Sequence, residues 1–202
     1  MTWLLATCAL MLFIWAFAEA FVWPVVPDVA LASLAFLAPE GAWLFVGATV
    51  GGSMAGGAAA MVAYRMGWRW PLPLVSDAMR ARVEHWLERG PIGLVNQPLT
   101  AVPYKAFVVE GARRRLAVAP WVMWTGVFRG ARMASVAVLA WIGSVLVGHV
   151  FAENAAQASV IILAIGLVVF VIGWRLAWRL WSGRESASPT RTPRGPTRTM
   201  QP

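Results

Sequence analysis

The sequence predicts an all-α fold, a polytopic bundle of membrane-spanning helices. The chain of 202 residues is 59% hydrophobic and only 13% charged, so most helix faces must contact lipid or one another. Four stretches also lack Asp, Glu, Lys and Arg altogether: residues 1–18, 41–64, 133–152 and 154–174. Each approaches the roughly 20 apolar residues that cross a hydrocarbon core of about 30 Å.

The first uncharged stretch predicts a span over residues 3–21. An apolar run near the start of a chain is also typical of a cleaved signal peptide. Here no basic segment precedes the run, no small-x-small site stands before a polar mature start, and apolar residues resume beyond Glu19. We therefore expect this segment to remain as a membrane helix.

A second span is predicted over residues 42–64, and a further pair over residues 119–148 and 158–178. The arginines set the orientation, because short loops rich in Lys and Arg stay in the cytoplasm. They gather after residue 174 and in the loop after the second span, at Arg65, Arg69, Arg80, Arg82 and Arg89. The first span then leaves the cytoplasm, the second returns to it, and both termini are predicted to be cytoplasmic.

Two intervening segments are too apolar for exposed loops, yet prolines interrupt them too often for single helices. They are residues 22–39, with Pro24 and Pro27, and residues 90–109, with Pro98 and Pro103. Each is predicted to be re-entrant, dipping into the membrane and returning to the same side with the prolines at its turn. On the path above, the first dips from outside and the second from inside. This arrangement predicts an inverted repeat, a recurring architecture of transporters.

The cytoplasmic segments divide into an amphipathic helix and a tail. Residues 76–90 place Met79 and Val83 on one helical face with charges elsewhere, so the helix either lies on the membrane surface or packs on the bundle. Residues 183–202 are polar, basic and Pro-rich, which predicts a disordered tail after a membrane domain over residues 1–182. We expect no binding to nucleic acid.

Glycines are concentrated in the second span. Gly47 with Gly51, and Gly52 with Gly56, form two small-x-x-x-small pairs, a spacing that lets helices approach closely. Tight packing inside the bundle is favoured over a dimer face, although a homo-oligomer remains open as an interpretation.

Six ionisable residues lie at predicted membrane depth, where each costs roughly 2.5 kcal/mol or more. They are Glu19, Asp28, Lys105, Glu110, Arg129 and Arg132. Arg129 and Arg132 are three residues apart and so share one helical face, where they could grip a phosphate or hold the acids in ion pairs. A carboxylate near the midplane could also take up and release a proton during transport.

Two structural interpretations of these charges stay open. The charges could form a buried network that only fixes helix register. Alternatively, the arginines could extend to the cytoplasmic interface, as long basic side chains do near helix ends.

Cofactor, metal and enzyme chemistry are not expected. Cys8 is the only cysteine and His85 and His149 are the only histidines, so a disulfide framework or a thiolate metal cluster is excluded and a His-rich metal site is not expected. Ser144 and His149 share one predicted span, but five residues along a helix place them poorly for a nucleophile and its base.

Several motifs resemble the DedA/VTT-domain family, the SNARE-associated Golgi protein group. The segment "FAEAFVWPVVPDVAL" has that family's acidic residues around a Pro-rich turn, at Glu19 and Asp28. The glycine-rich span ending in "AYRMG" is similar to its glycine-rich helix. The segments "PLTAVPYKAF" and "GVFRGARM" look most like the short YqaA-type branch. Thr100 stands where the better-known branch has the first of two arginines around its proline.

The resemblance implies two opposed re-entrant helices and movement of phospholipid-like molecules across the bacterial inner membrane. The implied substrates are undecaprenyl phosphate or phosphatidylethanolamine, with protons as a coupling ion. By position, Glu19 and Asp28 would be the acidic pair, and Lys105, Arg129 and Arg132 the bases that face phosphate. The main hypothesis is therefore a lipid transporter or scramblase. The alternative is a non-transporting, membrane-organising protein whose buried charges are structural.

Overall fold

The computed structural model describes residues 2–21, 27–69, 75–97, 100 and 102–150, with isolated positions between 154 and 176. Its regular elements, within this part of the chain, are all helical. Three segments are long and apolar enough to cross a membrane: α1 (Thr2–Glu19), the segment of η1 and α3 (Pro39–Arg65), and α6 (Val118–Val150). The all-helical class and a bundle compatible with a membrane are thus confirmed.

Shorter helices connect these three. They are α2 (Asp28–Leu37), η1 (Pro39–Gly41, preceding α3 at Ala42–Arg65), α4 (Asp77–Trp86), η2 (Leu87–Asn96) and α5 (Tyr104–Arg113). The predicted spans over residues 42–64 and 119–148 agree closely with α3 and α6. The last predicted span, for the most part, and all of the tail over residues 183–202 lie outside the described residues.

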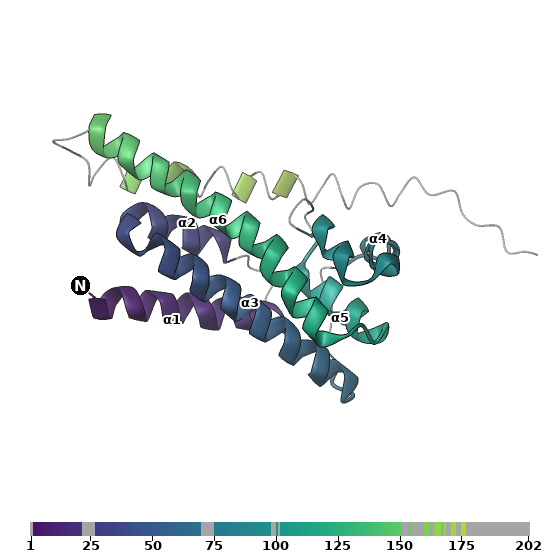
Figure 1. Cartoon of the computed structure of the whole chain (residues 1–202). Helices are drawn as coiled ribbons and strands as arrows, with labels where there is room; N and C mark the ends of the chain where they lie inside the picture. The colour runs from purple at the N-terminus through teal and green to yellow at the C-terminus, as the bar shows by residue number, and fades with distance from the viewer. Residues whose placement is uncertain are drawn as a thin grey trace, which may run out of the picture.

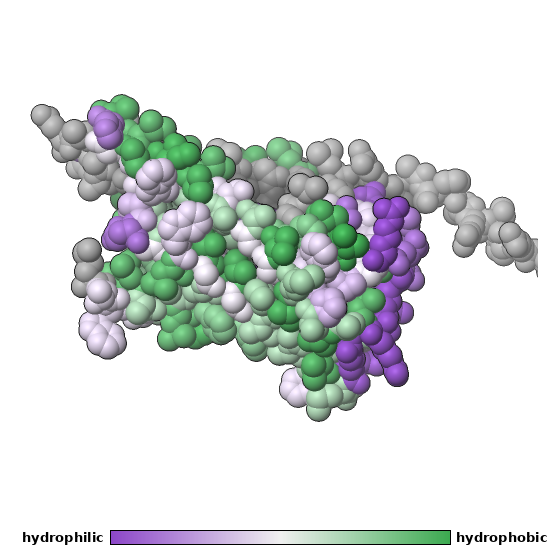
Figure 2. All heavy atoms as spheres, in the orientation of Figure 1, coloured by the Kyte–Doolittle hydropathy of each residue, from purple (hydrophilic) through white to green (hydrophobic). Residues whose placement is uncertain are grey.

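The outer surface is apolar along the helices. Trp3 is 86% exposed and Leu139 is 69% exposed, and many other large apolar side chains of α1 and α6 are exposed as well. Figure 2 shows that apolar residues cover most of the visible surface and that strongly hydrophilic residues gather at one end. This surface is suited to lipid, with the arginine-rich end in the headgroup region or water.

The directions of the long helices follow from their contacts. A Cβ placed at Gly52 would meet the backbone of Phe13, and one at Gly56 the backbone of Phe17, so α1 and α3 run parallel. In contrast, Gly126 faces Met54 and Gly130 faces Val50, so α6 runs antiparallel to α3. The N-terminus therefore lies at the opposite end of the bundle from Arg65 (Figure 1).

This direction corrects the predicted path, in which the first and second spans were antiparallel. The physical reason is where the chain reverses. α2 runs back alongside α6, with Asp28 beside Arg132 and Phe36 beside Gly143. The reversal thus takes place within the bundle, between Glu19 and Asp28. Because α1 and α2 form a helical hairpin, the chain reaches α3 at the end where α1 began.

The predicted turn prolines are partly described. Pro27 directly precedes α2, and Pro103 directly precedes α5 with an extended backbone that suits the start of a helix. Pro24 and Pro98 lie outside the described residues. Pro27 and Pro103 therefore each stand directly before the start of a helix, and their place in re-entrant turns stays a prediction.

A second hairpin is formed by η2 and α5. Its turn lies between Gln97 and Tyr104, and Tyr104 is packed against Gly57 in the second half of α3. α5 then runs parallel to α3 and ends with Arg113 near Arg65. α5 therefore ends at the arginine-rich end of the bundle, whereas α2 ends at the N-terminal end.

The amphipathic helix α4 packs on the bundle. Met79 and Val83 are buried, and the Trp86 ring stacks on Phe107 of α5 with centroids 5.8 Å apart. The Ser76 side chain caps the helix by accepting a hydrogen bond from the Met79 amide at 3.2 Å. Of the two interpretations of this segment, the structure favours packing on the bundle.

Candidate functional site

Arg129 of α6 is the centre of the candidate site. Its guanidinium donates two hydrogen bonds to the Glu19 carboxylate, at 2.5 and 3.4 Å. The side chains are only 5% and 7% exposed, respectively. Two nearly parallel bonds between a fork of donors and a carboxylate form the strongest class of protein ion pair. Residue 19, at the end of α1, is thereby fixed to the middle of α6.

A second ion pair lies one helical turn further along α6. Arg132 donates to Asp28 at 2.8 Å, which joins α6 to the first residue of α2. Asp28 is buried, whereas the Arg132 side chain is 28% exposed. The Asp28–Arg132 pair is therefore the more accessible of the two, and a competing anion would reach Arg132 more readily than Arg129.

The second hairpin contacts the site through Tyr104. The Arg129 guanidinium lies over the Tyr104 ring, 4.6 Å from its centroid, an arrangement that attracts a cation to the electron-rich face. The Tyr104 hydroxyl lies 2.9 Å from the Thr125 hydroxyl and accepts a hydrogen bond from the Trp121 indole at 3.2 Å. Arg129 therefore touches the ends of both hairpins, where each reverses.

Small residues allow this close approach. A Cβ at Gly57 would overlap the Tyr104 hydroxyl, so only glycine leaves room for the ring beside Arg129. At Gly111, a Cβ would meet the Trp121 ring at 2.7 Å. The sequence predicted that the small-x-x-x-small glycine pairs of α3 serve helix packing. The contacts of Gly52 and Gly56 with α1 support this prediction, whereas Gly47 faces open space.

Some buried polar atoms keep bonding capacity. Within the described part of the chain, Asp28 Oδ1 and Arg129 Nε are buried without a hydrogen-bond partner, as is Ser53 Oγ on the neighbouring face of α3. Buried polar atoms without partners are costly and call for a reason, such as an exchanging ligand or proton. The site thus holds more donor and acceptor capacity than its two ion pairs use.

The structure brings together four of the five predicted site residues, as two acid–arginine pairs. Of the open interpretations, extension to the interface is wrong for Arg129, because its guanidinium is buried. Lys105 belongs to neither ion pair. It lies one residue after Tyr104 and is half-buried.

Sequence reasoning missed the polar partners of Arg129. Tyr104, Thr125 and Trp121 are each almost fully buried, yet only the charged residues were singled out. A signal existed for Thr125, which precedes Arg129 by four residues and so shares its helical face. No such signal exists for Tyr104, because it reaches the site by packing against Gly57, which is far away in the sequence.

Metal chemistry and homology add no further constraint. Within the described residues, no three His, Cys, Asp or Glu side chains gather as a metal site would require. Comparisons with protein-family models, curated proteins and solved structures found no match. The function is therefore argued from the geometry of the charged site and from its position among apolar helices.

Proposed function

We propose that this chain is a membrane lipid transporter of the DedA/VTT type, a flippase or scramblase that moves a phosphate-bearing lipid. The observation that supports the proposal is Arg129, a buried arginine that contacts the reversal points of two hairpins entering from opposite ends. Charges at membrane depth are rare and typically line a substrate or proton path. Undecaprenyl phosphate and phosphatidylethanolamine have headgroups that such arginines recognise.

The two hairpins are proposed to be re-entrant and related as an inverted repeat. In transporters of this kind, the binding site lies near the midplane, where broken helices from the two halves meet. The proposed orientation places the arginine-rich end and the C-terminus in the cytoplasm and the N-terminus on the other side of the inner membrane. The resemblance to the YqaA-type branch agrees with this architecture.

The Asp28–Arg132 pair suggests how a headgroup would pass. A phosphate can compete with Asp28 for the partly exposed Arg132, while the acyl chains stay in lipid beside the apolar exterior. Uptake and release of a proton by a carboxylate of the site would couple lipid movement to protons. Lys105 would add a point charge on the path of the headgroup.

One observation favours the alternative of a non-transporting, membrane-organising protein. Both arginines already have carboxylate partners, and a closed network of this kind can serve helix register alone. The two functions differ in what a substitution in the partly exposed Asp28–Arg132 pair does. A transporter loses lipid movement while it stays folded, whereas a structural network loses folding.

We expect Asp28→Asn and Arg132→Ala to reduce lipid translocation to near the rate of empty vesicles. The measurement uses proteoliposomes with fluorescent phosphatidylethanolamine and an undecaprenyl-phosphate probe. Arg80→Ala on α4 is the matched control, because it removes an exposed charge away from the site. Thermal unfolding in detergent confirms that each variant is folded. Unchanged translocation by folded Asp28→Asn and Arg132→Ala, or none by the wild type, would count against transport.

A further inference from the structure

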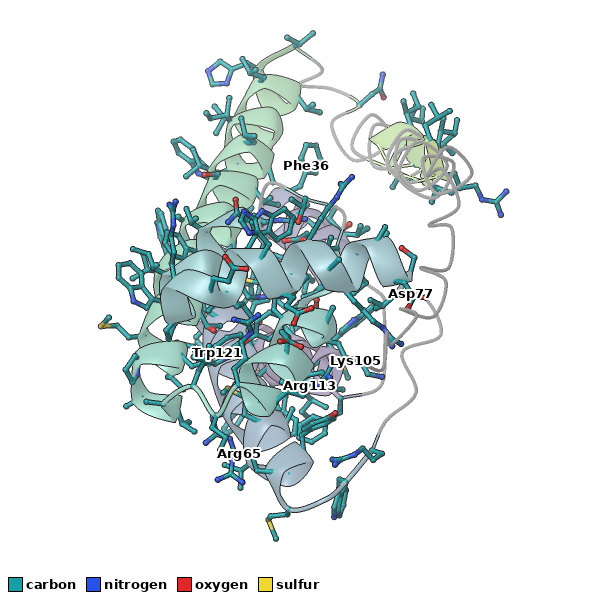
Figure 3. The ribbon with its side chains drawn as sticks, turned by 90° about the vertical axis from the view of Figure 1, so that its right-hand side faces the viewer. Phe36, Arg65, Asp77, Lys105, Arg113 and Trp121 are labelled. Atoms are coloured by element: carbon teal, nitrogen blue, oxygen red, sulfur yellow. The ribbon has the colours of Figure 1, made fainter. Side chains whose placement is uncertain are left out.

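A second, separate group of arginines surrounds a recess at the arginine-rich end of the bundle. The recess has a volume of about 680 Å³ and lies between the end of α3 and the turn that joins α5 to α6. It is lined by Tyr64, Arg65, Arg69, Ala112, Arg113 and Arg115. Figure 3, which views the bundle from this end, shows Arg65 and Arg113 on these neighbouring elements. The ion pairs of Arg129 and Arg132 take no part in it.

Two of the arginines are held in place. Arg65 donates a hydrogen bond to the Leu116 carbonyl oxygen, which joins the end of α3 to the turn before α6. Arg69 donates to the Tyr64 carbonyl at 3.0 Å, and its guanidinium lies 4.4 Å from the centroid of the Tyr64 ring. A ligand therefore meets guanidinium groups that are already positioned, which lowers the entropy lost on binding.

Arg115 adopts a backbone conformation that suits glycine. Its φ is +55°, and it is the only described residue other than glycine with a positive φ. Arg115 belongs to a Schellman motif at the end of α5. In this motif, the Leu116 amide donates to the Gly111 carbonyl oxygen, and the Arg115 amide donates to the Ala112 carbonyl oxygen. Glycine is the usual residue at this position because it has no Cβ. An arginine kept at such a strained position points to a role for its charge.

The side chains that line the recess carry a net positive charge. Among the described residues, Glu110 is the only carboxylate in an ion pair with an arginine of the recess, at 3.5 Å from Arg113. Glu110 also binds Arg114 more closely, at 2.8 Å. Arg65, Arg69 and Arg115 are not paired with a described carboxylate, so the recess should attract a compact anion.

We propose that this recess binds the phosphate headgroup of an anionic membrane lipid. An apolar groove on α3 begins at the same end, with Ala59, Val62, Met66 and Trp68 among its lining residues. Met66 is 76% exposed and Trp68 is 61% exposed, as expected for side chains at a membrane interface. The recess lies at the end of a membrane span, where large apolar side chains of the same helix end are exposed, and this position fits a phosphate with acyl chains attached rather than a free phosphate. The proposal does not depend on transport through Arg129.

The test measures lipid binding to the full-length protein by native mass spectrometry from detergent micelles. The probes are phosphatidylglycerol, phosphatidylcholine with the same acyl chains, and inorganic phosphate. We expect phosphatidylglycerol to bind the wild type several-fold more tightly than phosphatidylcholine. The double variant Arg113→Gln with Arg115→Gly should weaken phosphatidylglycerol binding roughly tenfold or more, since each arginine near a membrane surface contributes about a fivefold factor.

A charge-matched control separates the recess from general electrostatics. Arg80→Gln with Arg89→Gln removes the same charge from exposed sites on α4 and η2 and should change binding less than twofold. Arg115→Gly should leave the Tm equal or higher, because glycine adopts the positive φ without strain. Equal loss in both double variants, or no preference for phosphatidylglycerol in the wild type, would overturn the proposal. Displacement of the lipid by an equal concentration of inorganic phosphate would overturn the lipid assignment.

Discussion

Replacing Arg129 with methionine is expected to lower the free energy of unfolding by about 3–5 kcal/mol, because it leaves the buried Glu19 carboxylate without its counter-ion. The loss should come mainly from the unpaired charge, since methionine fills much of the same volume. Unfolding in mixed micelles with increasing denaturing detergent measures this difference. Arg132→Met is the matched comparison and should cost less than half as much, because that side chain is 28% exposed.

A double variant tests the cause. Glu19→Gln together with Arg129→Met removes both charges, and we expect it to recover most of the stability that Arg129→Met loses. If the double variant is no more stable than Arg129→Met, the stability lost by Arg129→Met does not come from an unpaired Glu19 carboxylate. That result would indicate instead that packing around Arg129, including the contact with Tyr104, dominates.

Gly52→Ala is expected to lower the free energy of unfolding by about 1–3 kcal/mol, because its methyl group would overlap the Phe13 carbonyl oxygen and force α1 away from α3. The clash is with backbone, so no rotamer change can relieve it. The same unfolding measurement applies here. A Gly52→Ala variant as stable as the wild type would mean that α1 and α3 do not pack this closely.

A second glycine of α3 serves as the control, and its replacement is expected to change stability in the opposite direction. Gly47 lies in the same helix, but a Cβ there meets nothing within 4 Å. Gly47→Ala should therefore raise stability by up to about 1 kcal/mol, through helix propensity alone. If both variants lose stability alike, the effect belongs to α3 itself and not to its packing on α1.

The spans and charged residues could be predicted from the sequence, since both rest on local signals. The uncharged stretch over residues 41–64 predicts α3 because membrane-spanning helices need a length of apolar residues that loops do not. Glu19, Asp28, Arg129 and Arg132 were found because ionisable groups are conspicuous in apolar surroundings. α6, which matches the predicted span over residues 119–148, is one helix of 33 residues. At about 50 Å it is longer than a bilayer core of about 30 Å, so it must tilt or project beyond it.

The direction of α1 could not be predicted in the same way. Hydropathy measures the length of an apolar run, and a run of this length serves equally as a complete span or as one arm of a hairpin. In the structure, the end of α1 is fixed by the ion pair of Glu19. Its partner Arg129 lies 110 residues away, inside the bundle, and no local pattern reports that distance. The contacts of Tyr104 with Thr125 and Gly57 were hidden for the same reason.

The most direct test of the two opposed hairpins is the side of the membrane from which their ends react. Single cysteines at Thr2, Glu40, Arg80 and Arg113, in a Cys8→Ala background, are labelled with a membrane-impermeant maleimide in intact cells and in inside-out vesicles. We expect Thr2→Cys and Glu40→Cys to react from outside, and Arg80→Cys and Arg113→Cys from the cytoplasm. Labelling of Thr2→Cys and Glu40→Cys from opposite sides would show that α1 crosses the membrane alone, and would contradict the paired hairpins that meet at Arg129.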